Sequence, residues 1–142
     1  MRRLLALTLL LASVSCSKDS STNPTTESLA GTWNLSTINN LPLPFLLAEA
    51  DLQTVPPTPR IELLNDQIVA TSAGTFVETA NARITDGTGT FTVPFTDKGT
   101  WTLSGNTITF HFDSDGSSGT GTLSENTFTI GETGFKSVYV KQ

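Results

Sequence analysis

Apolar and polar residues alternate along most of the chain from residue 60 onward, and turn-forming residues recur every eight to twelve positions. Alternation with a period of two is typical of strands that bury one face of a sheet. A weak helical periodicity is confined to residues 45–53. The pattern therefore predicts an all-β protein built as an antiparallel up-and-down meander.

One hairpin sequence occurs twice, as GTWTLSGNTITF at residues 99–110 and as GTGTLSENTFTI at residues 119–130. Residues that pair across a hairpin must point to the same face of the sheet. With Gly105-Asn106 as a two-residue turn, Trp101 pairs with Phe110, and the threonines fall on the opposite face. The repeated sequence therefore predicts repeated hairpins that share one apolar face.

The same test locates four further turns, and it places apolar residues on one face of at least six consecutive strands. The three-residue loops are closed by a glycine in the left-handed conformation. The expected turns and pairs are Ser72-Ala73-Gly74 with Ala70 opposite Phe76, Asp86-Gly87 with Ala82 opposite Phe91 and Ala80 opposite Val93, Asp97-Lys98-Gly99 with Phe95 opposite Trp101, and Glu125-Asn126 with Leu123 opposite Phe128.

A meander of this length leaves two unprotected edges unless it closes on itself. We therefore expect a closed barrel of 8–10 strands, in which the last strand, residues 135–140, lies beside the first, residues 32–38. The strand at residues 67–71 is the least well defined. In the last strand, two sets of residues compete for the inside: Phe135, Ser137 and Tyr139, or Val138 and Val140.

Three segments resemble the lipocalin-like domains of small bacterial lipoproteins: LAGTWNLSTINNLPLPF at 29–45, SAGTFVET at 72–79, and GTWTLSGNTITF. Gly31-Thr32-Trp33 matches the Gly-x-Trp of the first lipocalin strand, whose Trp closes the barrel floor. The paired cysteines and the Thr-Asp-Tyr motif of lipocalins are absent from the sequence. The resemblance covers residues 29–142 and implies a calycin-type barrel. The strand count and the long insertion between the first two strands are closer to the fatty-acid-binding branch of the wider superfamily. That branch has a helical lid in the place of the insertion.

The insertion at residues 39–59 contains five prolines around an apolar centre, Phe45-Leu46-Leu47. A long connection inside a compact domain is usually functional or disordered. Three interpretations stay open: a plug that covers the open end of the barrel, a mobile lid formed by Phe45, Leu46 and Leu47 over a ligand portal, or a partner-binding surface. We expect the insertion to cap one end of the barrel.

The first 15 residues have the order of a bacterial secretory signal, with Arg2 and Arg3 before an apolar run too short to span a bilayer permanently. The only cysteine, Cys16, follows directly. This arrangement resembles a lipoprotein lipobox, although Ser13 stands where Leu is usual, and it implies a diacylglycerol thioether on Cys16. Residues 16–28 would then form a lipid-anchored tether before the barrel domain at 29–142. The alternative is a soluble secreted protein with a free N-terminal cysteine.

This N-terminus predicts export and anchoring to the membrane of the bacterial envelope, with the barrel in the periplasm or on the surface. Ser17 after the cysteine favours the outer membrane. The formal net charge is −5, and removal of the signal with its two arginines makes it two units more negative. A chain this acidic has no basic face for phosphates, so we expect no nucleic-acid partner. We expect a monomer.

Few residues offer catalytic chemistry. His111 is the only histidine, and the hairpin register places it opposite Thr100 on the outer face. Without a second cysteine or histidine, zinc and thiol sites are not expected. The segment 113–116 resembles the start of a calcium loop but lacks the downstream Glu of an EF-hand. We expect no metal, no cofactor and no enzymatic activity.

Glu78 is expected to point into the barrel, beside Ile68 and Phe95, because it shares its face with the apolar residues of its strand. A buried carboxylate must be protonated, hydrated or paired. Arg60 and Arg83 fall on the outer face, so neither is an obvious partner. Glu78 is therefore either a residue near the barrel mouth that reaches water or backbone N–H groups, or a polar anchor for a ligand.

These patterns favour a lipid-anchored barrel that binds a small apolar molecule. The residues expected to line the site are Trp33, Glu78, Phe95, Trp101 and Phe110. The alternative is a ligand-free structural or protein-interaction lipoprotein with a filled barrel, since barrels of about eight strands can be either packed or hollow.

Overall fold

A computed structural model describes residues 29–49, 59–132 and 134–142, so the expected signal and tether lie outside the described residues. In the part of the chain that the structure describes, no helix is long and apolar enough to cross a membrane. The described strands are β1 (Gly31–Ile38), β2 (Leu41–Pro42), β3 (Phe45–Ala48), β4 (Arg60–Ala70), β5 (Thr75–Asp86), β6 (Gly89–Ser104), β7 (Thr107–Phe112), β8 (Ser118–Ser124), β9 (Thr127–Glu132) and β10 (Phe135–Lys141).

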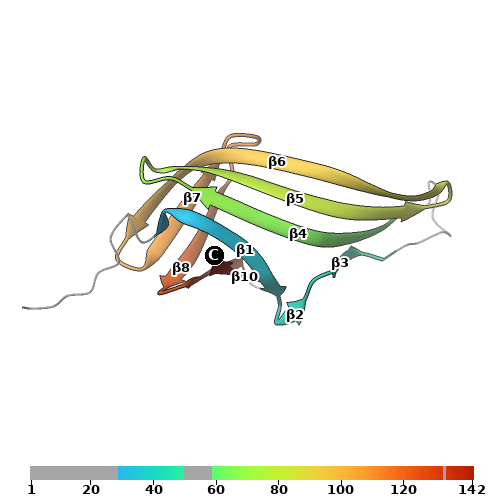
Figure 1. The fold of residues 1–142 in the computed structure, drawn as a ribbon, viewed down its shortest axis with the longest axis horizontal. Helices are drawn as coiled ribbons and strands as arrows, with labels where there is room; N and C mark the ends of the chain where they lie inside the picture. The colour runs from blue at the N-terminus through green and yellow to red at the C-terminus, as the bar shows by residue number, and fades with distance from the viewer. Residues whose placement is uncertain (1–28, 50–58, 133) are drawn as a thin grey trace, which may run out of the picture.

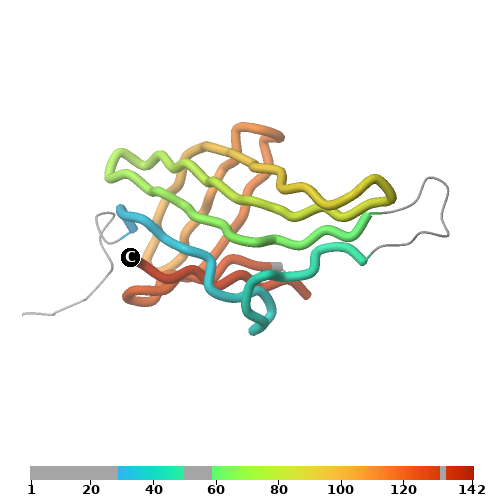
Figure 2. Tube along the Cα trace, turned by 45° about the vertical axis from the view of Figure 1, so that its right-hand side comes forward, coloured from blue at the N-terminus to red at the C-terminus, as the bar shows by residue number. Residues whose placement is uncertain are grey.

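The meander closes into a barrel, as the sequence predicts. Consecutive strands from β4 to β10 pair antiparallel, and β1 pairs with β10 on one side and with β4 on the other. Trp33 of β1 therefore has Lys141 and Ile68 as its two neighbours across the seam. The closed wall has eight strands, β1 and β4 to β10, and the N- and C-terminal strands lie side by side in both views (Figures 1 and 2).

Three of the predicted turns are confirmed. Trp101 pairs with Phe110 around Gly105, which has a φ of 59°. The hairpin of β8 and β9 has the predicted register, with Leu123 opposite Phe128. Ala70 lies opposite Phe76 across a loop in which Gly74 is left-handed. His111 pairs with Thr100 and is exposed, as expected.

The predicted turn at Asp86-Gly87 is wrong by one position. Asp86 pairs with Gly89, so the turn residues are Gly87 and Thr88. The Asp86 carboxylate accepts hydrogen bonds from the Thr88 backbone N–H and hydroxyl at 2.8 and 2.6 Å, which fixes this turn. Ala82 therefore lies opposite Val93 rather than Phe91, and Ala80 opposite Phe95.

The predicted loop at Asp97-Lys98-Gly99 is also wrong, because β6 runs through these residues without a break. Phe95 therefore does not pair with Trp101; Gly99 instead lies opposite Phe76 on β5 and Phe112 on β7. Gly99 is needed for close approach, since a Cβ there would overlap the carbonyl oxygen of His111. The turn-favouring residues Asp97, Lys98 and Gly99 lie inside one long strand, and the alternation of inward and outward side chains continues through them.

A β-bulge in β4 keeps both halves of that strand facing inward. The pairing with β5 shifts between Leu63 and Asn65, so Leu64 is the extra residue. Before the bulge the odd-numbered residues share a face with the inward residues of β5, and after it the even-numbered ones do. This change turns Asp66 and Ile68 into the barrel.

Aromatic rings fill the closed part of the barrel. The ring of Phe128 lies 4.9 Å from Trp33, 5.8 Å from Phe110 and 4.6 Å from Tyr139, between ring centroids. All four residues are buried. In β10, Ser137 and Tyr139 face inward, which settles the register that the sequence left open.

The strands β4, β5 and β6 continue beyond the closed wall and, together with β3, form an arm that is visible at the right of Figures 1 and 2. We define the arm as β3 with residues 60–63 of β4, 80–86 of β5 and 89–95 of β6. There β3 replaces β1 as the neighbour of β4, while the pairing of β6 with β7 begins only at Gly99. Pro94, which lacks a backbone donor, lies on the edge strand of the arm, where it discourages further pairing.

The insertion forms short strands where it is described, and residues 45–48 are a strand rather than part of a helix. Phe45 is half-buried and packs against the core, with its ring centroid 6.1 Å from that of Phe135. Leu46 and Leu47 are exposed. Residues 50–58 lie outside the described residues, so capping by the insertion stays a prediction.

Substituting Gly99 tests the unbroken path of β6. We expect Gly99→Ala to lower the free energy of unfolding by at least about 2 kcal/mol, because the new methyl group overlaps β7. Urea unfolding followed by tryptophan fluorescence measures the change.

Gly87→Ala is the matched control, since a Cβ at Gly87 meets nothing within 4 Å. We expect that variant to lie within about 1 kcal/mol of the wild type. Equal effects of the two substitutions would mean that residue 99 sits in an open turn.

Candidate functional site

Three acidic side chains and one tyrosine meet on the inward face where the closed wall continues into the arm. Glu78 of β5 lies opposite Asp97 of β6 on one side and opposite Ile68 of β4 on the other. Asp66 lies two residues from Ile68 on β4 and shares its face. Tyr139 reaches the group from β10, across the seam.

Asp66 is the buried centre of this group. The residue is 9% exposed, and its Oδ2 accepts a hydrogen bond of 2.7 Å from the Tyr139 hydroxyl. The Tyr139 ring is held in place by stacking on Phe128 at an interplanar angle of 15°. Oδ1 of Asp66 is buried and has no hydrogen-bond partner among the described residues. A buried acceptor without a partner costs free energy. The proton that Asp66 shares with the neighbouring Glu78 lowers that cost.

The acids hold a proton between them at neutral pH. Burial, followed by the charge of and hydrogen bond to Asp66 and by the charge of Asp97, raises the pKa of Glu78 to about 8. Burial also raises the pKa of Asp66, while the hydrogen bond from Tyr139 opposes that shift. Burial, and then the negative charge of Asp66, raise the pKa of the Tyr139 hydroxyl. Glu78 is therefore largely a neutral acid at pH 7, and its titration is linked to that of Asp66.

Glu78 and Asp97 open onto a hollow of about 390 Å³, which we call the carboxyl hollow. Its wall is completed by Ser114, whose hydroxyl donates a hydrogen bond of 2.6 Å to Asp97 Oδ2. Phe95 presents an apolar surface to the hollow and is 52% exposed. The volume is near the low end for small-molecule sites. The lining residues are Glu78, Ala80, Phe95, Thr96, Asp97 and Ser114.

A second hollow of about 390 Å³ lies at the seam between β1 and β4, and we call it the seam hollow. It is lined by Leu35 and Asp66 together with polar residues, two of which, Gln67 and Asn34, are joined by a hydrogen bond of 2.8 Å. Asp66 therefore borders the seam hollow and also contacts Glu78 of the carboxyl hollow. A further hollow of about 370 Å³ lies on the threonine-rich outer face of β7 to β10, away from the acids.

The structure brings only two of the five expected ligand-lining residues together. Glu78 and Phe95 line the carboxyl hollow. Trp33, Trp101 and Phe110 are buried in the core instead. The indole N–H of Trp33 donates to the backbone carbonyl of Leu29 at 2.7 Å, and that of Trp101 to the carbonyl of Thr75 at 3.2 Å. Neither indole lines the carboxyl hollow. Ligand contact by any of the five stays a prediction.

Sequence reasoning missed Asp66, Asp97 and Tyr139 as members of one group. Asp66 and Ala70 are an even number of positions apart, so their side chains point to the same face of β4. Because the pairing of Ala70 with Phe76 was predicted, the same alternation could have placed Asp66 inside the barrel. Asp97 was assigned to a turn, although it follows the alternation that turns every second side chain of β6 inward. The role of Tyr139 carried no sequence signal, because its partner lies 73 residues away.

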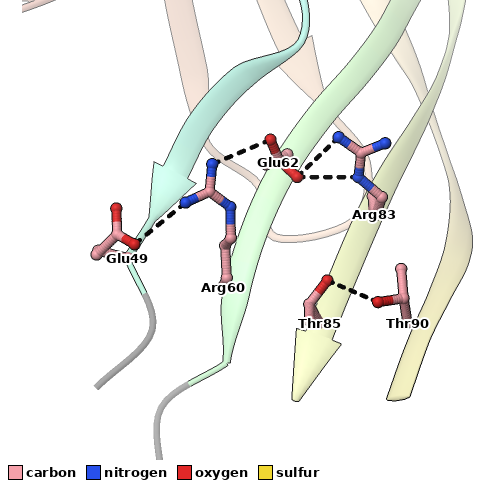
Figure 3. Close-up of polar contacts among 6 residues, drawn as sticks. All are labelled: Glu49, Arg60, Glu62, Arg83, Thr85 and Thr90. Carbon is pink, nitrogen blue, oxygen red and sulfur yellow. Dashed lines mark hydrogen bonds and ion pairs between the residues drawn. The ribbon is translucent and has the colours of Figure 1, made fainter. Parts of the chain in front are cut away.

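The basic residues of the arm are engaged on its outer face, as predicted (Figure 3). Glu62 is held by Arg83 at 2.9 Å and by Arg60 at 3.2 Å, and Arg60 also reaches Glu49 at 3.1 Å. The hydrogen bond from Arg83, followed by that from Arg60, lowers the pKa of Glu62. These arginines therefore do not neutralise the inward acids.

The segment 113–116 forms a turn in which the Asp115 carboxylate accepts a hydrogen bond of 2.8 Å from the Ser117 backbone N–H. Within residues 29–49, 59–132 and 134–142, no group of three His, Cys, Asp or Glu side chains is placed to hold a metal ion.

An eight-stranded up-and-down barrel with a Gly-x-Trp first strand is the architecture of a calycin-type protein. The family model of the lipocalin-like domain matches residues 29–130 of the chain. The chain therefore belongs to the lipocalin-like domain family. The match ends before β10, although β10 closes the barrel against β1. A search of curated proteins found no match to the chain.

The raised pKa of Glu78 predicts that the protein loses stability as the pH rises from about 4.5 to about 8. In this range the native state keeps a proton that the unfolded chain has lost, so unfolding is favoured by increasing pH. We expect Glu78→Gln to reduce this slope and to be more stable than the wild type above pH 8, as measured by urea unfolding across the range.

Glu125→Gln serves as the control, because Glu125 is exposed in the turn between β8 and β9. That variant should keep the wild-type slope. A slope that is unchanged by Glu78→Gln would show that Glu78 is ionised at neutral pH in the folded protein.

Proposed function

We propose that this protein binds a small molecule with an apolar body in the carboxyl hollow, at the junction of the barrel and the arm. The observation that carries the proposal is a hollow of about 390 Å³ in which the half-exposed Phe95 ring lies next to Glu78 and Asp97. An exposed aromatic ring beside a few polar groups is the usual composition of a ligand site. Membership of the lipocalin-like family supports binding as the role.

Binding is favoured over catalysis by the chemistry of the lining. The hydroxyl of Ser114 donates to Asp97, and His111 lies on the outer face and contacts Ser118 instead. A serine needs a nearby base to become a nucleophile. Glu78, largely neutral at pH 7, is suited to hold a polar group of a ligand.

A filled barrel that acts through its surface is the second candidate. The packed aromatic core supports it, since Trp33, Phe110 and Phe128 are fully buried. The exposed apolar side chains of Leu46 and Leu47 on β3 would then contribute to a protein-binding surface.

We further propose that the protein is exported and anchored to the bacterial envelope through a lipid on Cys16. The support is the order of the N-terminal sequence, with a basic start, a short apolar run and a single cysteine. The tether of residues 16–28 would lead to β1, which begins at the end of the barrel opposite the tip of the arm (Figure 1). The arm would then project away from the anchored end.

A neutral fluorescent probe, N-phenyl-1-naphthylamine, tests binding in the carboxyl hollow. We expect its fluorescence to rise on addition of the protein, and Phe95→Ala to weaken binding by about tenfold or more, because an apolar contact of the hollow is lost. Fluorescence titration gives the dissociation constants.

Phe91→Ala is a matched control, because Phe91 lies on the same face of β6 and is 46% exposed but does not line the hollow. It should leave the dissociation constant unchanged. No binding by the wild type, or equal weakening by both variants, would favour the filled barrel. Native mass spectrometry of protein from its own host would show any carried ligand.

The lipid anchor predicts the mass of the mature N-terminus. Protein purified from its host should begin at Cys16 and carry the mass of a diacylglycerol, and Cys16→Ser should release the protein from the membrane fraction. Mass spectrometry of the N-terminal peptide measures this. A mature chain with an unmodified cysteine would instead indicate a soluble secreted protein.

A further inference from the structure

We propose that the seam hollow is a second binding site, which takes a neutral ligand rich in hydroxyl groups, such as a sugar unit. The ligand would lie on the outer surface between β1 and β4, and one of its hydroxyl groups would donate to Asp66. This inference goes beyond the proposed function, because the seam hollow and the carboxyl hollow share no lining residue.

The seam hollow lies where the barrel wall opens. The pairing of β1 with β4 ends at Asn34 and Gln67, and β3 takes the place of β1 beside β4 only from Leu63. Residues 64–66 of β4 therefore have no strand partner on that side in the described part of the chain. Each of the two strands also has a bulge at this point, and a bulge bends the strand that carries it. Asp66 is thereby accessible to the hollow of about 390 Å³ that it helps to line.

An unpaired acceptor in the lining is the first observation that points to a ligand. Asp66 is 9% exposed, and its Oδ1 has no hydrogen-bond partner among the described residues. Tyr139 donates to Oδ2 instead. The proton shared with Glu78 reduces the charge of this pair of acids but leaves Oδ1 without a donor at hydrogen-bonding geometry. Proteins usually complete such an atom with a ligand, an ion or water. A donor in the seam hollow would complete it.

A row of polar side chains beside this acceptor is the second observation. Asn34, Gln67 and Thr79 are direct neighbours across β1, β4 and β5, so their side chains lie about 5 Å apart on the outer face. Asn34 Oδ1 accepts a hydrogen bond of 2.8 Å from Gln67 Nε2. Asn65 Oδ1 accepts one of 2.9 Å from Asn81 Nδ2. Each amide that lines the hollow is therefore oriented by one hydrogen bond.

These side chains keep hydrogen-bonding positions for a ligand. The Nδ2 groups of Asn34 and Asn65 take part in no hydrogen bond of the described residues, and the same holds there for Gln67 Oε1 and the Thr79 hydroxyl. An amide offers donors and an acceptor side by side, and a hydroxyl group both donates and accepts. A ligand that carries several hydroxyl groups on one small frame can therefore use all of these positions at once.

The lining favours a neutral ligand over a charged or an apolar one. Among the described residues that line the hollow, none is Lys, Arg or His, so an anion would have no partner of opposite charge. Asp66 is the only acid among them, and it shares a proton with Glu78, which weakens its attraction for a cation. Leu35 is the only large apolar residue and is itself buried, so an apolar ligand would find little surface to cover. A sugar or another polyol remains as the class that fits.

A panel of neutral sugars tests the proposal: glucose, galactose, mannose, N-acetylglucosamine and cellobiose. Proton–nitrogen correlation spectra of the full mature protein show the side-chain NH₂ signals of Asn34, Asn65 and Gln67, which report contact with the seam hollow directly. We expect at least one sugar of the panel to shift all three signals and to bind with a Kd of about 1 mM or lower.

Glucosamine, glucuronate and n-hexanol test the class of ligand in the same spectra. The first two keep a sugar ring but carry a positive or a negative charge, and the third is largely apolar. We expect each to bind at the three signals at least tenfold more weakly than the tightest neutral sugar. The physical reason is that a charge without an opposite charge in the lining is costly to desolvate.

Two variants and a matched control locate the site. Asp66→Asn should weaken binding of that sugar by about tenfold or more, because the amide has one acceptor oxygen and Tyr139 already donates to this position. Thr79→Val, which removes one exposed hydroxyl and keeps the shape, should weaken it by about threefold or more. Thr102→Val is the control, because Thr102 is also exposed on the outer face but does not line the hollow; its Kd should equal that of the wild type.

Failure of every sugar in the panel to bind with a Kd below about 10 mM would mean that water fills the hollow, and it overturns the proposal. Tighter binding of a charged probe, or sugar binding that survives both Asp66→Asn and Thr79→Val, overturns it as well. If Asp66→Asn does not fold, Thr79→Val and the amide signals of the wild type decide the question. The titration with N-phenyl-1-naphthylamine reports on the carboxyl hollow separately, so loss of the sugar site leaves the proposed function in place.

Discussion

The pairing of β1 with both β4 and β10 is the constraint on which the rest of the structure depends. It removes both edges of the meander, so the apolar face becomes an enclosed core. It also brings Tyr139, near the end of the chain, within 2.7 Å of Asp66 on β4. Without this seam, Asp66 would lie on an open sheet exposed to water and would gain neither its partner nor its raised pKa.

The junction of barrel and arm explains why the hollows form where they do. The strands β4, β5 and β6 are longer than the seam that closes them, so they continue outward beyond their neighbours in the closed wall. Aromatic rings fill the barrel on one side of this junction. On the other side the inward face of β6 loses its cover, and Phe95 is left half-exposed.

The acids at this junction are costly for a fold of this size. Buried carboxyl groups without a cation destabilise the native state, and the raised pKa of Glu78 shows that the protein offsets the cost by keeping a proton. An apolar side chain in place of Asp66 would remove that cost. Unfavourable groups of this kind cluster at functional sites, because a ligand recovers there what the fold gives up.

The sequence by itself determined the β class, the closure, the inward direction of Glu78 and the outward direction of Arg60 and Arg83, because a period of two leaves each side chain only two faces. The sequence pattern placed the turn at residues 86–87 one position early. It also predicted a loop at 97–99 inside β6, since turn-forming residues also occur inside long strands. Only the tertiary structure decided that Asp66, Asp97 and Tyr139 join Glu78. That meeting depends on the bulge at Leu64 and on the seam, and both arise from contacts between strands distant in sequence, which no local pattern encodes.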